Sequence, residues 1–399
     1  MKLFGIIFFA LLMSCSKHSD YSGNWELELK LQDQILPAII KLEQKKNIVT
    51  GELINSKESL SLVGKIKNDI LTMSIGPHYS EFNFQLKNGM LDGLWVRTNK
   101  DDFKVKISGK KTSNLDLFKK YIQIDNLNNV NGEWKIQLDE KTFGLGQFKQ
   151  VGSRVSGSIL TETGDYRYLD GYIVNNEIKL YGFDGVFSFV INLNIIDSKL
   201  VGKMYSGTTF NQEIEGVRDS SFKLRDANEM TVATAKVVKN FKQIDIFNKK
   251  VSFNDDEYKN KIKIIQLFGS WCPNCIDETN FFVRWRKENV SKLNHIAFIA
   301  LSFEKTDSKQ VAIKNLKKSV DKLQMDYPVI LVDFNKTVEV SSILPIEKVL
   351  AYPTTIFLNH KNEIVKIHTG FSGQATDGHF EQFENEFNET ISTLLSGLN

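Results

Sequence analysis

The first half of the chain repeats itself, and this repeat constrains the fold more than any other feature. The Gly-x-Trp formed by Gly23 and Trp25 recurs at Gly132 and Trp134, and four further apolar-x-Gly steps recur in the same order. Equivalent residues of the two copies lie about 107 residues apart. A constant period over so many landmarks indicates two copies of one structural unit.

Within each copy, apolar and polar residues alternate along short segments. Trp25 and Leu27 are each followed by a polar residue, and the segment after Trp134 repeats this pattern. Such a period of two is typical of half-buried strands, and the Asn-Gly and Asp-Gly pairs between segments favour tight turns. We therefore predict two all-β domains, each a small barrel or sandwich, at residues 20–112 and 128–219.

Charge and side-chain clustering give few indications of a partner. The chain has 51 basic and 48 acidic residues, and this near-neutral balance argues against nucleic-acid binding. Neither repeat holds a cluster of ionisable residues that suggests catalysis. The aromatic residues of the repeats are expected in the core and not in a ligand cage. They include Trp95, Tyr166, Tyr168, Phe187 and Phe189.

The pattern changes after residue 219. Residues 220–239 are polar and predict a partly helical connector. Strand and helix patterns then alternate, which predicts an α/β domain at residues 240–399. The apolar runs at 261–268 and 295–303 are typical of central strands buried on both faces. A helix ending near residue 288 is expected between them. Further helices and strands are predicted at 309–323, 329–332, 354–358, 363–368 and 379–395.

Cys272 and Cys275 stand two residues apart at the start of the helix predicted after the first central strand. A structural zinc site needs four ligands, and the six histidines form no closely spaced pair, so we expect no metal. At a helix N-terminus, free N–H groups and the helix dipole stabilise a thiolate, which makes Cys272 the candidate nucleophile. Cys275 lies one turn further and can attack a mixed disulfide at Cys272. Pro273 suits a first helical turn. No cofactor is expected beyond this redox-active disulfide.

The segment WCPNC at 271–275, followed some eighty residues later by AYPTT at 351–355, resembles the thioredoxin fold. It is most similar to the TlpA/ResA-like thiol-disulfide oxidoreductases, and the similarity covers residues 227–399. The resemblance implies that Pro353 is cis and faces the cysteine pair, and that the backbone before it pairs with the substrate chain. Four residues are therefore expected at the substrate: Trp271, Pro273, Tyr352 and Pro353.

The resemblance also implies a role for a carboxylate near the second cysteine. Thioredoxins have a buried Asp where this chain has Gln266, and an amide there suits the TlpA/ResA-like branch. In some members a Glu at the position of Glu278 tunes the thiols, and one helical turn would let it exchange a proton with Cys275. The alternative is a surface glutamate favoured by the helix dipole. Asp277 is predicted to be solvated, and Asn280 replaces a family proline, so no helix kink is expected.

The N-terminus has the layout of a secretory signal peptide at residues 1–14, with a lysine, an apolar run at 3–13 and then Cys15. The run is shorter than the roughly 20 residues that span a bilayer. The residues LMSC resemble the bacterial lipobox, which implies lipidation of Cys15 and attachment to a membrane. The alternative is an ordinary secretory signal with an incidental cysteine.

These features predict an enzyme, a periplasm-facing lipoprotein of the bacterial cell envelope. It would exchange two electrons with protein disulfide or dithiol substrates through a mixed disulfide. By resemblance it would act as a reductase, kept reduced by a membrane electron donor. The alternative is a lipid-anchored binding protein whose β-repeats hold an envelope partner or ligand, with the cysteine pair accessory or a site for a soft metal.

Overall fold

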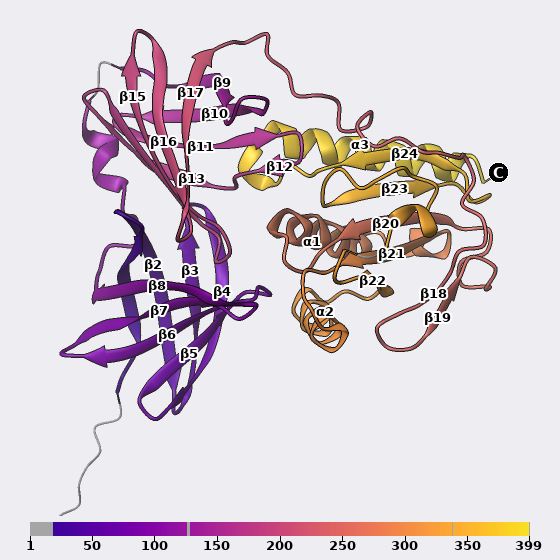
Figure 1. The fold of residues 1–399 in the computed structure, drawn as a ribbon, viewed down its shortest axis with the longest axis horizontal. Helices are drawn as coiled ribbons and strands as arrows, with labels where there is room; N and C mark the ends of the chain where they lie inside the picture. The colour runs from indigo at the N-terminus through magenta and orange to yellow at the C-terminus, as the bar shows by residue number, and fades with distance from the viewer. Residues whose placement is uncertain (1–18, 126–127, 337, 399) are drawn as a thin grey trace, which may run out of the picture.

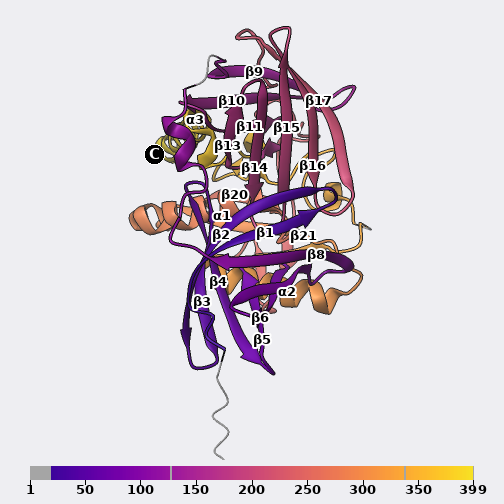
Figure 2. The same ribbon diagram turned by 90° about the vertical axis from the view of Figure 1, so that its left-hand side faces the viewer.

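The computed structural model describes residues 19–125, 128–336 and 338–398. It contains two closed β-barrels and a mixed unit of strands and helices beside them (Figure 1). Seen from the side of the barrels, they stand one above the other in front of the α/β unit (Figure 2). The predicted signal peptide at 1–14 and Cys15 lie outside the described residues. Within those residues, no helix is both long enough and apolar enough to cross a membrane.

The first barrel is a meander in which each strand pairs antiparallel with the next and the last pairs with the first. Along β1 the inward side chains Trp25, Leu27 and Leu29 are fully buried, as the alternation predicted. The strands are β1 (Gly23–Leu31), β2 (Gln34–Lys45), β3 (Ile48–Asn55), β4 (Glu58–Lys67), β5 (Ile70–Ile75), β6 (Ser80–Lys87), β7 (Met90–Arg97) and β8 (Lys100–Lys111).

The second barrel follows a short 3-10 helix, η1 (Lys119–Gln123), and closes through the pairing of β10 with β11. Its short strand β12 pairs with β11. The strands are β9 (Gly132–Gln137), β10 (Phe143–Val151), β11 (Arg154–Thr161), β12 (Gly164–Asp165), β13 (Leu169–Val174), β14 (Glu177–Phe183), β15 (Ser188–Ile196), β16 (Lys199–Ser206) and β17 (Phe210–Arg218).

The recurring residues make equivalent contacts in the two barrels. The indole N–H of Trp25 donates to the carbonyl of Tyr21 over 2.9 Å, and that of Trp134 donates to the carbonyl of Val130 over 3.0 Å. The recurring glycines lie where strands approach closely. A Cβ at Gly51 or at its counterpart in the second barrel would collide with a carbonyl oxygen of the neighbouring strand. The repeated sequence steps thus mark positions that a barrel of this shape requires.

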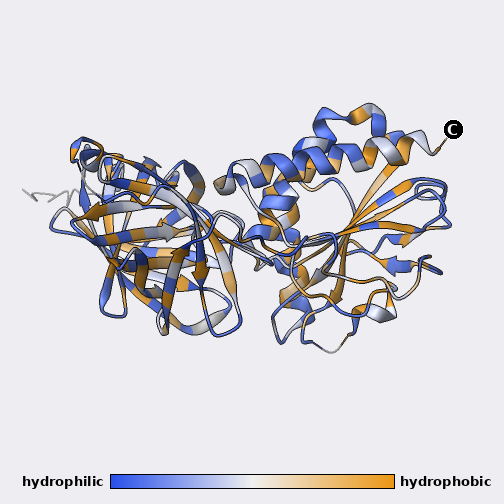
Figure 3. Ribbon diagram, turned by 90° about the horizontal axis from the view of Figure 1, so that it is seen from above, coloured by the Kyte–Doolittle hydropathy of each residue, from blue (hydrophilic) through white to orange (hydrophobic). Residues whose placement is uncertain are grey.

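The α/β unit is built on a five-stranded sheet in the order β22-β21-β20-β23-β24. The first three strands are parallel, and β23 and β24 run antiparallel to their neighbours. Every residue of β20 and β21 is buried, because helices and loops cover both faces of the sheet. Figure 3 shows these strands as hydrophobic, whereas the helices present mixed surfaces.

The elements of this unit agree with the sequence predictions to within two residues. An additional two-stranded sheet, β18–β19, precedes the main sheet. The elements are β18 (Lys242–Ile244), β19 (Lys250–Ser252), β20 (Ile262–Phe268), α1 (Pro273–Glu288), η2 (Val290–Asn294), β21 (Ile296–Phe303), α2 (Lys309–Leu323), β22 (Val329–Asp333), η3 (Val340–Ser342), β23 (Thr354–Leu358), β24 (Ile364–Thr369), η4 (Gln374–Thr376) and α3 (Gly378–Ser396).

The prediction of a partly helical connector was wrong. Residues 220–239 contain turns, bends and two isolated β-bridges. Several of their backbone groups bond to the α/β unit: Thr234 N–H donates to the Pro345 carbonyl, and the Lys236 carbonyl accepts from Ile364 N–H. These partners satisfy the backbone without a helix. The domain bounds at 20–112, 128–219, 220–239 and 240–399 stay predictions.

Candidate active site

The cysteine pair lies at the start of α1, directly after the central strand β20. Cys272 is the N-cap residue, and Cys275 N–H donates to its sulfur over 3.3 Å. The two cysteines form a disulfide with Cα atoms 5.3 Å apart. Cys272 is 6% exposed and Cys275 is fully buried. Pro273 occupies the first helical position, where its missing N–H costs no hydrogen bond.

The loop before β23 lies against Cys272. The Tyr352-Pro353 peptide bond is cis. The sulfur of Cys272 is 3.5 Å from the carbonyl oxygen of Tyr352. Trp271 packs edge-on against the Tyr352 ring at 5.8 Å, and its indole N–H donates to the Phe303 carbonyl over 2.9 Å. The structure therefore brings together the four residues predicted to contact substrate; their contact with a substrate stays a prediction.

Glu278 is fully buried, so the surface alternative was wrong. Thr355 Oγ1 donates to its Oε1 over 2.7 Å, and Gln266 Nε2 donates to its Oε2 over 2.9 Å. Burial raises the pKa of Glu278 to about 8, although both hydrogen bonds act in the opposite direction. The amide at Gln266 thus holds the carboxyl in place beside the helix turn that carries Cys275, whose carbonyl lies 3.5 Å from the same amide.

Asp277 was predicted to be solvated, and this was wrong. Its side chain is 24% exposed, and its Oδ2 lies 2.8 Å from Nη1 of Arg167 in the second barrel. Burial raises the pKa of Asp277 to about 7, against the attraction of Arg167. Arg167 also pairs with Glu58 of the first barrel and lies 3.8 Å from Asp184 of the second. These ion pairs, which we call the Arg167 cluster, connect both barrels to α1. As expected, α1 continues through the exposed Asn280.

A second contact joins the first barrel to the α/β unit beside the cysteine pair. Glu304, 3% exposed, accepts hydrogen bonds from the Ser270 N–H over 2.9 Å and from the Tyr79 hydroxyl over 3.1 Å. Lys318 of α2 donates to the His78 carbonyl over 3.1 Å. Sequence reasoning missed the contacts of Tyr79, Lys318 and Arg167, because each joins units that meet only in the folded protein.

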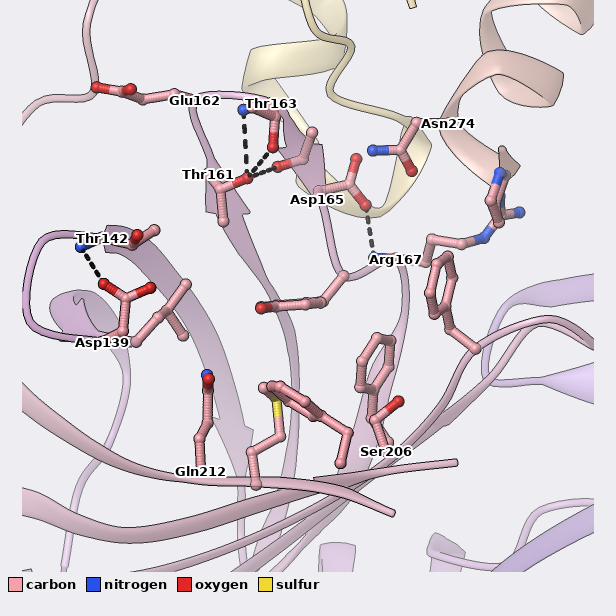
Figure 4. A pocket seen from close by; sticks show the side chains of 18 of the residues that line it. Asp139, Thr142, Thr161, Glu162, Thr163, Asp165, Arg167, Ser206, Gln212 and Asn274 are labelled. Carbon is pink, nitrogen blue, oxygen red and sulfur yellow. Dashed lines mark hydrogen bonds between the residues drawn. The ribbon is translucent and has the colours of Figure 1, made fainter. Parts of the chain in front are cut away.

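A cavity of about 870 Å³ lies between the open end of the second barrel and the start of α1. Its wall includes residues 271–274 on one side and aromatic residues of the barrel on the other. Figure 4 shows the polar side of the cavity, where Asp165 of the barrel and Asn274 of α1 lie next to each other. Of the aromatics predicted to be core, Phe189 is 7% exposed, whereas Phe187 is 39% exposed and also lines this cavity.

Within the described parts of the chain, no group of three or more His, Cys, Asp or Glu residues is arranged to hold a metal ion.

No protein-family model matches the chain, and no curated protein matches it significantly.

Solved structures resemble about two fifths of the chain. They include a thiol-disulfide oxidoreductase from Bacteroides fragilis, with 17% identity and a TM-score of 0.29 over 37% of this chain and 99% of that one. The thioredoxin domain of a thiol-disulfide oxidoreductase from Bacteroides vulgatus matches with 18% identity and a TM-score of 0.28. The match covers 39% of this chain and 97% of that one. A DsbF homologue from Corynebacterium diphtheriae matches with 15% identity and a TM-score of 0.28. The match covers 43% of this chain and 96% of that one.

Proposed function

We propose that the protein is a thiol-disulfide oxidoreductase whose C-terminal domain is thioredoxin-like. One observation carries the proposal: the disulfide of Cys272 and Cys275 begins α1, and the Tyr352 carbonyl beside cis Pro353 lies 3.5 Å from the Cys272 sulfur. The sheet order β22-β21-β20-β23-β24, with α1 after the central strand, supports the thioredoxin-like assignment. The equivalent tryptophan and glycine contacts of the barrels support their origin by duplication.

The reaction begins with the reduced pair. The Cys272 thiolate attacks a substrate disulfide, forms a bond to one substrate sulfur and expels the other as a thiolate. The Cys275 thiolate then attacks the Cys272 sulfur, closes the intramolecular disulfide and releases the second substrate thiolate. Two electrons pass from the pair to the substrate. A dithiol donor must then reduce the disulfide again, and we propose that this donor is a membrane protein.

Glu278 serves the second step. Cys275 is fully buried and must lose its proton before it can attack. A pKa raised to about 8 makes ionised Glu278 a stronger base than an ordinary carboxylate, so it is better suited to accept a thiol proton. We therefore assign Glu278 as the group that accepts this proton.

Reduction of a protein disulfide by the purified protein tests the proposal. The wild-type protein should reduce insulin, and the Cys272→Ser variant should show no exchange. Retained activity in that variant would exclude the mechanism.

The direction of electron flow follows from the reduction potential. We propose a reductase, which requires a potential near or below about −250 mV; a value of about −120 to −180 mV would indicate an oxidant or isomerase. The reduction potential can be measured by equilibration with thiol and disulfide buffers, followed by the fluorescence of Trp271, which adjoins the cysteine pair.

We further propose that lipid on Cys15 holds the protein at the periplasmic face of an envelope membrane. Labelling with a radioactive fatty acid, lost in Cys15→Ser, would support this.

The cavity favours a second candidate function. A concave site lined by aromatic residues suits a binding protein, in which the barrels hold an envelope ligand and the cysteine pair is accessory. The Cys272→Ser variant distinguishes the two candidate functions. A binding protein would keep its biological role in this variant, whereas a thiol-disulfide oxidoreductase would lose it.

A further inference from the structure

We call the cavity between the second barrel and α1 the barrel-mouth cavity. Large, exposed apolar side chains line it. Phe187 is 39% exposed and Phe210 is 50% exposed, and both line it. Phe187 stacks at 6.0 Å on Phe189, which lines the cavity as well. Exposed aromatic rings gathered in a cavity indicate a place where an apolar group binds.

Two charged residues that line this cavity, Arg97 and Asp184, also make contacts within the protein. The guanidinium of Arg97 lies 4.5 Å from the centre of the Phe103 ring and donates to the Val186 carbonyl. Asp184 accepts from the N–H groups of Val186 and Phe187 over 2.8 and 2.6 Å. The exposed aromatic rings of the wall favour an uncharged, apolar group of a ligand.

The opposite wall of the same cavity contains Cys272. Because Cys272 is only 6% exposed, a disulfide must enter a confined space to reach its sulfur. A flat protein surface does not fit such a space, but an extended segment does. Threonine hydroxyls at positions 142, 161, 163, 208 and 209 line the cavity and can bond to the main chain of a segment.

We propose that the barrel-mouth cavity selects the substrate of the cysteine pair. It holds an aromatic or large aliphatic side chain next to a cysteine in an extended polypeptide segment, while the disulfide of that cysteine meets the sulfur of Cys272. The volume of about 870 Å³ admits more than one side chain, which favours a polypeptide over a small disulfide. This inference rests on the proposed oxidoreductase function and assigns the second barrel a part in it.

Two peptide disulfides that differ only in the residues flanking their cysteines test the inference. In one, phenylalanine flanks each cysteine; in the other, serine does. The full-length reduced protein should reduce the phenylalanine peptide with a kcat/KM at least tenfold higher, because the ring leaves water for the cavity. In the double variant Phe187→Ser, Phe210→Ser this ratio should fall to about one. The ratio is taken within each variant, so a general loss of activity does not affect it.

Ile196→Ser is the matched control, since Ile196 is 51% exposed on the same barrel and does not line the cavity. It should keep the wild-type ratio. Equal rates for the two peptides with wild-type protein would overturn the inference and leave the proposed function intact. A dependence on Phe187 and Phe210 seen for a small aromatic disulfide but not for the peptides would also overturn it. Failure to reduce any disulfide would refute the proposed function itself.

Discussion

Glu278 is a carboxyl group held in the interior by two neutral donors, the hydroxyl of Thr355 and the amide of Gln266. Neither donor carries a charge, so their hydrogen bonds lower the pKa of Glu278 by less than burial raises it. The pKa is therefore raised to about 8. An arginine or lysine in place of either donor would stabilise the carboxylate and leave it a poor acceptor for a thiol proton.

Replacing Glu278 by Gln should slow the second chemical step and spare the first. Attack by the buried Cys275 should fall about 100-fold, within the range for loss of a general base, while attack by Cys272 keeps its rate. The mixed disulfide should then accumulate in rapid acid-quench experiments with a peptide disulfide. Glu288→Gln, at the exposed end of the same helix, should behave as wild type. An equal slowing of both steps would argue against the proton-transfer role.

The same residue predicts a pH dependence of stability. The folded-state pKa of Glu278 is raised from 4.5 to about 8, so the folded protein binds this proton more tightly than the unfolded chain. Its contribution is fully present below about pH 4.5 and is lost as the pH rises toward 8. Between pH 5 and pH 8, the wild type should lose a few kcal/mol more stability than Glu278→Gln, at about 1.4 kcal/mol per pKa unit. Urea unfolding of the oxidised proteins measures the difference; identical losses would contradict it.

Helix α1 gives its two cysteines different environments. Cys272 is the N-cap, next to free backbone N–H groups, whereas Cys275 lies one turn inside and is fully buried. In the reduced protein, iodoacetamide should therefore modify Cys272 at least ten times faster than Cys275, as peptide mass spectrometry can measure. The two rates should become similar in urea. Similar rates in the folded protein would contradict the assignment of Cys272 as nucleophile.

The elements with strong periodicity could be predicted from sequence, and those fixed by partners could not. The run at 261–268 is apolar throughout, and it forms β20 in the buried centre of the sheet. The connector at 220–239 carries no comparable pattern, and its course follows from hydrogen bonds to distant loops. In the site, the family resemblance suggested a role for Glu278, three residues after Cys275, but left a surface position open. Nothing near Asp277 in sequence indicated its pairing with Arg167, which lies 110 positions earlier.

The Arg167 cluster connects all three units of the molecule. Arg167 pairs with Glu58 of the first barrel and Asp277 of α1, and lies near Asp184 of its own barrel. Asp165 is close by and accepts from the Gly373 N–H over 2.7 Å. One cation thus faces four carboxyl groups. Burial raises the pKa of Asp165, Asp184 and Asp277, so protons share the neutralisation of the cluster with Arg167.

This cluster should control how firmly the barrels cover the cysteine pair. Because the docked arrangement raises the pKa of Asp277 from 3.8 to about 7, docking binds a proton. Docking is therefore strongest at low pH and weakens as the pH rises through 7.

Arg167→Met should weaken docking by about 3–5 kcal/mol, since it leaves buried carboxyl groups without their cation. Small-angle X-ray scattering should then show a larger radius of gyration than wild type at pH 7.5, with the difference shrinking at pH 5, where Asp277 is protonated. Lys199→Met removes an exposed ion pair with Glu215 on the second barrel and should leave the radius unchanged. If Arg167→Met keeps the wild-type radius at both pH values, the barrels are held by other contacts, foremost the buried hydrogen bond from the Tyr79 hydroxyl to Glu304.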